Sequence, residues 1–166
     1  MLSKAEFLAA LKRETKILTH LASRLEAKHL DHRLTPTQRS IGELLQYLTI
    51  NAQASTTYFL TGSWDHWDAT AEKAKGVDLA GFVKALKKQD ATVAKLLKPI
   101  SDKAFITKAV KPVWGKGSVP LAQALFENTL TWAIGYRTQL FLQAKSAGLV
   151  DLGSSDLWAG KAPKKK

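Results

Sequence analysis

The sequence predicts an all-α protein that folds as a four-helix bundle. Four segments of about 20 to 30 residues repeat apolar residues at spacings of three and four, which is typical of helices that bury one face. Each segment begins after a serine or an aspartate, and prolines and glycines lie beyond their ends. No stretch alternates apolar and polar residues as a half-buried strand does. The chain of 166 residues has the length of one ordinary domain.

The first two helices begin at capping boxes, in which a serine and a glutamate three residues later satisfy backbone amides of the first turn. Ser3 and Glu6 form the first box, and the helix behind them runs to about residue 28. Ser40 and Glu43 form the second box, and that helix stops at Gly62. The apolar stripes are Phe7, Leu11, Leu18, Leu21 and Leu25 on the first helix and Ile41, Leu44, Leu45, Leu48, Ala52 and Phe59 on the second.

Long connections follow the second and third helices. Residues 63–76 are expected to be irregular or loosely helical. Asp78 then caps a third helix, which ends before Pro99 because the residue before a proline disfavours the helical conformation. Residues 100–117 hold a Pro-Val-Trp-Gly-Lys-Gly loop, with a short extended or hairpin-like piece.

The fourth helix is apolar on two sides. Ser118 caps it, Pro120 lies in its first turn, and it continues to about residue 147. At 100° per residue, the arc expected to face the bundle interior contains Leu121, Leu125, Thr129, Trp132, Tyr136, Gln139 and Leu140. The second arc contains Phe126, Leu130, Ile134 and Phe141, with Arg137 beside it.

A helix with two apolar sides has to be covered on both. We expect a homodimer to bury the second arc, because a two-fold interface uses the same patch on both chains. The segment after Gly148 covers part of that arc in the same prediction. The bundle is therefore expected to span residues 1–150, and residues 151–166 form a C-terminal segment with a disordered basic tail.

Two stretches carry a family resemblance, RSIGELLQYL at residues 39–48 and WAIGYRTQLFLQAKSAG at residues 132–148. They resemble the motifs of the DinB/YfiT-like superfamily of bacterial four-helix bundles. Typical members show S-[IL]-x-E-L-L-x-H-L on the second helix and H-x-x-x-H-R-x-Q on the last one. The resemblance implies the fold of that superfamily for most of the chain.

In that superfamily three histidines bind a divalent metal at the mouth of the bundle. The resemblance places their positions on Tyr47, Trp132 and Tyr136 of this chain, while Arg137 and Gln139 match the R-x-Q. An indole N–H cannot coordinate a metal, and a tyrosine with a pKa near 10 is a poor ligand at neutral pH. We therefore expect neither the metal site of the superfamily nor any other cofactor.

These positions still define a candidate ligand pocket. Buried tyrosine and tryptophan side chains need hydrogen-bond partners, which Asn51, Asn128 and Gln139 could supply to them. Trp64 and His66 lie in the connection after the second helix, where they could form a lid over the bundle mouth or anchor the connection to the core. Two interpretations stay open, a former pocket filled to make a solid core and a reshaped pocket that holds an organic ligand.

The charge distribution argues against a nucleic-acid surface. The net charge is +11, but four of these charges lie in the tail KAPKKK at residues 161–166. The other positive stretch, residues 84–111, is rich in lysine, and no aromatic platform interleaves these lysines. No apolar run reaches the roughly 20 residues of a membrane span, and the N-terminus does not resemble a signal peptide. We expect a cytoplasmic protein without a membrane partner.

The sequence therefore predicts a non-catalytic module that binds a small molecule or a protein partner, and it identifies no catalytic residue. None of the common nucleotide-binding, hydrolase or metalloprotease motifs is present. The alternative is a transferase or isomerase that uses a metal or a thiol cosubstrate through other ligands. The resemblance implies that class of enzyme only weakly, because the histidines are replaced.

Overall fold

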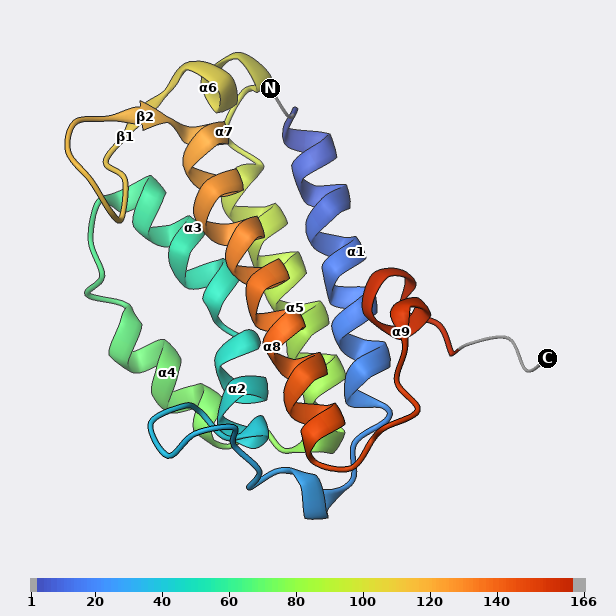
Figure 1. The fold of residues 1–166 in the computed structure, drawn as a ribbon. Helices are drawn as coiled ribbons and strands as arrows, with labels where there is room; N and C mark the ends of the chain where they lie inside the picture. Colours follow the sequence, from blue (N-terminus) through green and yellow to red (C-terminus); the bar gives the residue numbers. More distant parts are fainter. Residues whose placement is uncertain (1–2, 163–166) are drawn as a thin grey trace.

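The computed structural model describes residues 3–162, and its main body consists of four helical rods that run side by side (Figure 1). The rods are α1 (Lys4–Ala22), α2 with α3 (Ile41–Leu48 and Asn51–Thr61), α5 (Leu79–Leu97), and α7, η2 and α8 in continuation (Leu121–Ala124, Leu125–Leu130 and Thr131–Ser146). The expected all-α fold with a four-helix bundle is confirmed.

The expected long connections contain short elements of their own. The 3-10 turn η1 (Ala27–His29) follows α1, and α4 (Trp67–Lys75) follows α3. Helix α6 (Asp102–Thr107) and the antiparallel strands β1 (Ala109–Val110) and β2 (Val119–Pro120) lie between α5 and α7. Within residues 3–162, no helix combines the length and hydropathy that crossing a membrane requires.

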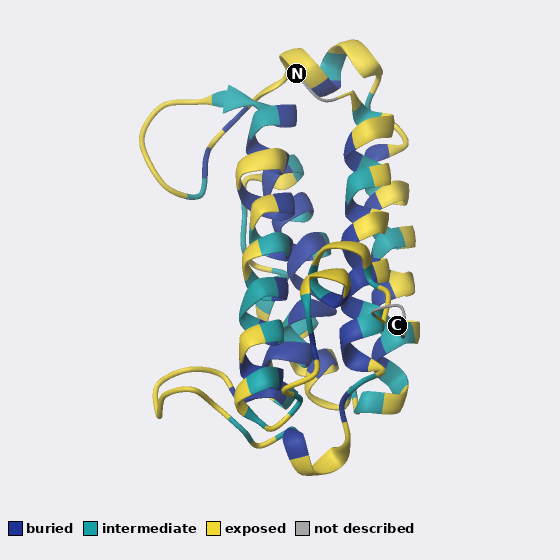
Figure 2. Cartoon of the chain, turned by 45° about the vertical axis from the view of Figure 1, so that its right-hand side comes forward, coloured by how far each residue is buried: buried dark blue, intermediate teal, exposed yellow. Residues whose placement is uncertain are grey.

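Buried residues lie along the whole length of the rods (Figure 2), and most of them are apolar. One cluster packs around Phe7, Phe105 and Leu125, and a second packs around Leu44 and Phe82. Each fully buried leucine or phenylalanine side chain contributes about 1.5–3 kcal/mol through the hydrophobic effect. The two clusters therefore hold the bundle together at both ends.

The expected helix starts at Ser3, Ser40 and Asp78 are present, but the expected start at Ser118 is wrong. The chain after Ser118 forms strand β2, and the fourth rod begins at Leu121 with Pro120 at its cap and no side-chain cap bond. The first helix is also shorter than its pattern suggests. Both capping boxes form, and the Asp78 carboxylate accepts a hydrogen bond of 2.7 Å from the Gly81 amide. Helix α1 ends at Ala22 instead of about residue 28. The buried His29 accepts a hydrogen bond of 2.9 Å from the Glu26 amide through Nδ1, which stabilises a separate 3-10 turn in place of a continued helix.

The second rod is interrupted between Leu48 and Asn51, where the sequence pattern predicts one continuous helix. The buried Gln89 of α5 bonds both sides of this break. Its Oε1 accepts from the Ala52 amide at 2.9 Å and from the Gln53 amide at 3.4 Å. Its Nε2 donates to the Leu48 carbonyl at 2.9 Å. One side chain thus satisfies backbone groups that a helix end would otherwise leave without partners.

The fourth rod contains a π-helical turn, η2, instead of regular α-helix throughout. The Thr131 amide donates to the Phe126 carbonyl, five residues earlier, which is the π pattern. Side chains also bond carbonyl groups of this turn. The Asn128 Nδ2 donates to the Ala124 carbonyl and the Thr131 hydroxyl donates to the Phe126 carbonyl, both at 2.9 Å.

This π turn changes which residues face the core. A π turn holds one residue more than an α turn, so it rotates the following helix by about 100° relative to a regular wheel. Beyond the turn, the buried stripe runs through Leu130, Ala133, Arg137, Leu140 and Ala144. Trp132, Tyr136 and Gln139 are only half-buried as a result. After Asn128, the buried positions are therefore shifted by one residue relative to those that a regular helical wheel predicts.

The C-terminal segment packs on the bundle through α9 (Ser154–Ala159), a helix that the sequence pattern does not predict. Gly160 ends it with φ of 57°, and a Cβ there would lie 3.1 Å from the Ile17 Cα of α1. A glycine is needed at this position both for the left-handed backbone and for the close approach. The basic tail expected to be disordered lies mostly outside the described residues, because these end at residue 162.

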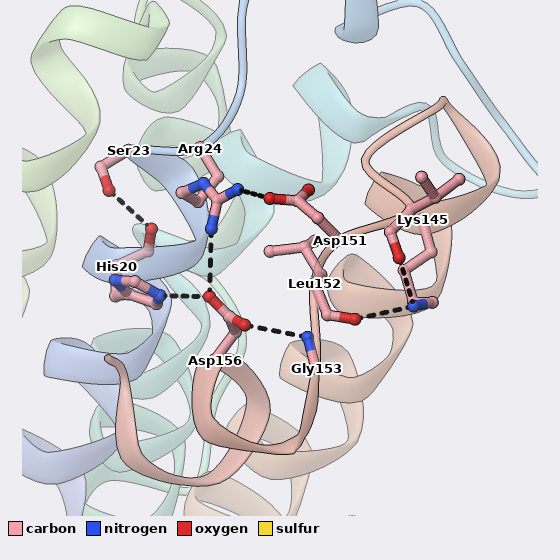
Figure 3. Close-up of polar contacts among 9 residues, drawn as sticks. His20, Ser23, Arg24, Lys145, Asp151, Leu152, Gly153 and Asp156 are labelled. Atoms are coloured by element: carbon pink, nitrogen blue, oxygen red, sulfur yellow. Dashed lines mark hydrogen bonds and ion pairs between the residues drawn. The ribbon is translucent and has the colours of Figure 1, made fainter. Parts of the chain in front are cut away.

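Asp156 fastens α9 to α1 (Figure 3). Its fully buried carboxylate contacts the His20 Nε2 at 2.7 Å, accepts from the Arg24 Nη1 at 3.3 Å and accepts from the Gly153 amide at 2.9 Å. Burial on its own raises the pKa of Asp156, but the Gly153 amide, His20 and Arg24 together hold the pKa below its ordinary value. The carboxylate is therefore bound in its ionised form.

We expect Asp156→Asn to lower the free energy of unfolding at pH 7 by about 1–3 kcal/mol, because buried donors lose a charged acceptor. The folded-state pKa of Asp156 lies below the unfolded value. Its contribution is therefore complete above the unfolded pKa of about 4 and is lost as the pH falls through the folded pKa. Urea unfolding should show a smaller difference in unfolding free energy between the wild type and Asp156→Asn at pH 3 than at pH 7.

The exposed Asp151 pairs with the same arginine at 2.5 Å and gives the matched control. Asp151→Asn should change the stability by less than about 1 kcal/mol, because exposed ion pairs contribute little. An equal gap between wild type and Asp156→Asn at both pH values would contradict the assigned role of the Asp156 charge.

Candidate functional site

The candidate pocket residues Tyr47 and Tyr136 lie against each other in the structure. Their ring centroids are 4.9 Å apart in an edge-to-face arrangement. The Arg39 guanidinium covers the Tyr47 ring at 4.2 Å and lies 5.9 Å from the Tyr136 ring. The space next to Tyr47 is further occupied by Trp67, whose ring centroid lies 6.0 Å away.

These side chains do not suit a divalent metal. Burial raises the pKa of Tyr47 well above its ordinary value, and the neighbouring Tyr136 hydroxyl raises it further. A phenol that stays neutral at all physiological pH values is a poor metal ligand. In the part of the chain that the structure describes, no group of three or more His, Cys, Asp or Glu residues is placed to hold a metal ion.

The other candidate pocket residues are dispersed. Trp132 and Gln139 are half-buried on α8 and have no ring pair or side-chain hydrogen bond among the described residues. Asn51 and Asn128 are buried, but Asn128 donates to its own helix and the Asn51 Nδ2 has no partner within residues 3–162. Amide-to-tyrosine hydrogen bonds are thus not found for these side chains.

The two loop candidates anchor the connection that leads into α4. Trp64 stacks on the Tyr58 ring at 4.5 Å with an interplanar angle of 14°. The His66 Nε2 lies 3.0 Å from the Ala54 carbonyl of α3, so this nitrogen carries the donated hydrogen. Trp64 also contacts Trp67 at 5.9 Å between ring centroids. An aromatic row therefore links α3, α4 and α2.

Helix α4 is attached at both ends and lies beside α2 (Figure 1). His66 holds its beginning to α3. At its other end, the Gln46 Nε2 of α2 donates to the Lys75 carbonyl at 2.8 Å and to the Val77 carbonyl at 3.5 Å. Between these attachments only Ala74 of α4 is buried. The helix thus bridges the surface of the bundle and leaves space beneath its middle.

That space is a cavity of about 400 Å³ between α3, α4 and α5. Its size falls in the range of about 300–1,000 Å³ that small-molecule sites occupy. Of the candidate pocket residues, only His66 lines it. The other lining residues are Thr49, Ile50, Gln53, Thr57, Thr70, Lys73, Ala74, Val77, Ala85, Lys88, Gln89, Thr92 and Leu96.

Four threonines contribute hydroxyl groups to the cavity wall. Their hydroxyls donate to backbone carbonyls of their own helices or turns, at distances from 2.7 Å for Thr49 to 2.9 Å for Thr92. Thr57 and Thr70 make the same bond at 2.8 Å. Each hydroxyl hydrogen is therefore used internally, and the hydroxyl oxygens stay available as acceptors.

A second depression, of about 510 Å³, lies where the end of α1 meets the start of α5. It is more open, and its lining consists mainly of alanine, leucine and valine with Ser23 and Asp78 as polar members. Ligand sites usually combine apolar walls with several convergent polar groups. The cavity under α4 fits that description better.

The five expected interface residues differ in exposure. Leu130 is 4% and Arg137 3% exposed, so both belong to the core of one chain. Phe126 is 47% exposed, while Ile134 and Phe141 are half-buried. The Trp158 ring of α9 covers the Arg137 guanidinium at 4.9 Å. The second arc is thus largely covered within one chain, and the homodimer stays a prediction.

Sequence reasoning did not identify the threonines, the lysines or Gln89 as site residues. A signal was present, because Gln53 and Thr57 on one helix and Ala85, Gln89 and Thr92 on another are spaced to share a helical face. It was hidden because the position of α4 opposite these faces depends on contacts between distant segments.

Comparisons with known proteins agree on the fold. No protein-family model matches the sequence, and no curated protein matches it. Among solved structures, a DinB-like protein named YjoA from Bacillus subtilis is similar with a TM-score of 0.62 and 12% identity, over 86% of this chain and 92% of that one. A DinB-like protein from Bacillus cereus ATCC 10987 is similar with a TM-score of 0.64 and 13% identity, over 88% of this chain and 93% of that one. The four-helix bundle of this chain therefore has the DinB-like fold.

Proposed function

We propose that this protein is a non-catalytic module that binds a small molecule in the cavity beneath α4. The observation that carries the proposal is the cavity itself, of about 400 Å³, with polar side chains from three helices converging on it. The attachments of His66 and Gln46 keep α4 in place over the bundle. A pre-formed cavity lowers the cost of ordering that binding would otherwise incur.

The proposal does not include the metal chemistry that the resemblance to DinB/YfiT-like proteins implies. The reason for leaving it out is the chemistry of the side chains at two of the former ligand positions. Tyr47 and Tyr136 form an aromatic pair under the Arg39 guanidinium. The alternative function is a transferase or isomerase with a metal or thiol cosubstrate held by other ligands. A stoichiometric metal in the purified protein, measured by elemental analysis, would favour this alternative.

The test fills the cavity. Ala85 lines it from α5 and is half-buried, so Ala85→Trp should occupy much of the space without unfolding the bundle. Ala91→Trp, at an exposed position of the same helix outside the cavity, is the matched control. A fragment library would be screened against the three proteins by ligand-observed NMR, with circular dichroism and thermal midpoints to verify folding.

We expect fragments that bind the wild type and Ala91→Trp but not Ala85→Trp. Affinities near 1 mM, or about 4 kcal/mol of binding free energy, suffice for detection and are ordinary for fragments. If every fragment that binds the wild type also binds folded Ala85→Trp, or if none binds, the cavity is not a ligand site and the proposal fails.

A further inference from the structure

Positive charge faces the cavity from two walls. Lys73 of α4 and Lys88 of α5 both line it, and among residues 3–162 no aspartate or glutamate does. Neither lysine forms an ion pair among the residues that the structure covers. On the same helix as Lys73, Lys75 pairs with Glu72 at 2.6 Å, so neutralised lysines do occur next to the cavity. The cavity lining thus includes two lysines, and no described residue of the lining supplies a compensating carboxylate.

Apart from the two glutamine amides, the uncharged polar side chains of the wall offer acceptors. The hydroxyls of Thr49, Thr57, Thr70 and Thr92 have donated their hydrogens to the backbone. The His66 ring donates through Nε2, which leaves Nδ1 as an acceptor while the ring is neutral. A bound molecule therefore has to supply donor groups of its own to satisfy these oxygens and this nitrogen.

Resting on the proposed function, we infer that the cavity takes a small anion that also carries hydroxyl or amine donors. The anionic group, a carboxylate or a phosphate, binds Lys73 and Lys88. The donor groups bond the threonine oxygens. A neutral polyol satisfies only the second requirement and a bare inorganic anion only the first, so both bind more weakly than a molecule that combines them.

The experiment compares probes with related skeletons on the full chain. D-gluconate carries a carboxylate and glucose 6-phosphate carries a phosphate on a hydroxylated skeleton. D-glucose lacks the charge, and inorganic phosphate lacks the skeleton. Each is titrated into ¹⁵N-labelled protein while the amide resonances of Thr57, Thr70 and Thr92 are followed. Tighter binding of gluconate than of glucose 6-phosphate assigns the anionic group as a carboxylate, and the reverse order assigns it as a phosphate.

The double variant Lys73→Gln/Lys88→Gln tests the charge, and Lys84→Gln/Lys87→Gln on α5 outside the cavity controls for the loss of two positive charges. We expect at least one organic anion to bind about tenfold or more tightly than glucose and inorganic phosphate. The cavity double variant should remove that difference, and the control double variant should retain it.

Three results would overturn the inference. In the first, glucose shifts these resonances at the same concentrations as the organic anions. In the second, the control double variant weakens anion binding as much as the cavity double variant does. In the third, neither organic anion shifts the resonances. If fragments are still lost in Ala85→Trp in these cases, the cavity remains a ligand site and only the ligand class is wrong.

Discussion

Arg137→Met is expected to lower the free energy of unfolding by about 3–5 kcal/mol, which is the usual cost of removing one partner of a buried ion pair. The Arg137 Nη1 donates to the Glu14 Oε2 at 2.5 Å, and the two side chains are 3% and 2% exposed. Methionine keeps the apolar volume of the arginine stem but leaves the Glu14 carboxylate without a buried cation. Urea unfolding at pH 7 measures the loss.

The double variant Glu14→Leu/Arg137→Met is the control. It should recover most of the loss, because replacing both members of a buried pair with apolar residues is often neutral or stabilising. If the single variant loses less than about 1 kcal/mol, the pair behaves like an exposed one and the Trp158 ring of α9 does not shield Arg137 from solvent.

The pH dependence of Arg137→Met follows from Glu14. Burial raises the pKa of Glu14, and the charge of Arg137 opposes that rise. Without the arginine the pKa of Glu14 rises further, so the folded variant takes up a proton more readily than its unfolded chain. A carboxyl with a raised folded-state pKa costs stability at higher pH, and that cost disappears as the pH falls below the unfolded pKa. The deficit should therefore be smaller at pH 4 than at pH 7.

Gln89→Leu is expected to cost about 3 kcal/mol, because it leaves backbone groups at the break of the second rod without partners and each buried one costs about 1–3 kcal/mol. These groups are the Leu48 carbonyl and the amides of Ala52 and Gln53. Leucine fits the volume of glutamine closely, so the loss reports hydrogen bonding more than packing. Chemical denaturation monitored by circular dichroism measures the cost.

Gln139→Leu is the matched control. Gln139 is half-buried on α8 and makes no side-chain hydrogen bond within residues 3–162, so the same substitution should change stability by less than about 0.5 kcal/mol. Equal losses in the two variants would mean that the Gln89 amide does not hold the break together. Because Gln89 also lines the cavity, its loss should weaken fragment binding as well.

The parts of the fold that depend on local chemistry could be predicted from the sequence. Serine, aspartate and glutamate caps define helix starts through side chains within three residues, and the starts at Ser3, Ser40 and Asp78 are as expected. The break after Leu48 could not be predicted, because the side chain that stabilises it comes from α5, 41 residues later in the chain. Helix α9 is also stabilised by distant partners, because Asp156 bonds His20 in α1 and Arg24 just after the end of α1.

One contact of the candidate site could be predicted. The motif resemblance placed Tyr47 and Tyr136 at the positions of two metal-binding histidines of the superfamily, and the structure brings their rings together. The cavity lies elsewhere because α4 crosses the bundle surface, and its contacts through Gln46 and His66 join residues that are remote in sequence. Polar residues such as Thr57 and Thr92 carry no motif, so only their common position reveals them.

The π turn at Leu125–Leu130 means that residue number and side-chain orientation are not related in the fourth rod as they are in the uninterrupted helices α1 and α5. One residue more or fewer in this turn turns all of α8 about its own axis, so chain length and not side-chain chemistry decides whether Arg137 or Tyr136 points at α1. Two proteins with the same α8 sequence could therefore bury faces of it that differ by about 100°. A residue-by-residue alignment of this helix with a DinB-like protein depends on whether a one-residue gap is placed in the π turn. That choice decides whether Trp132 and Tyr136 correspond to ligand positions.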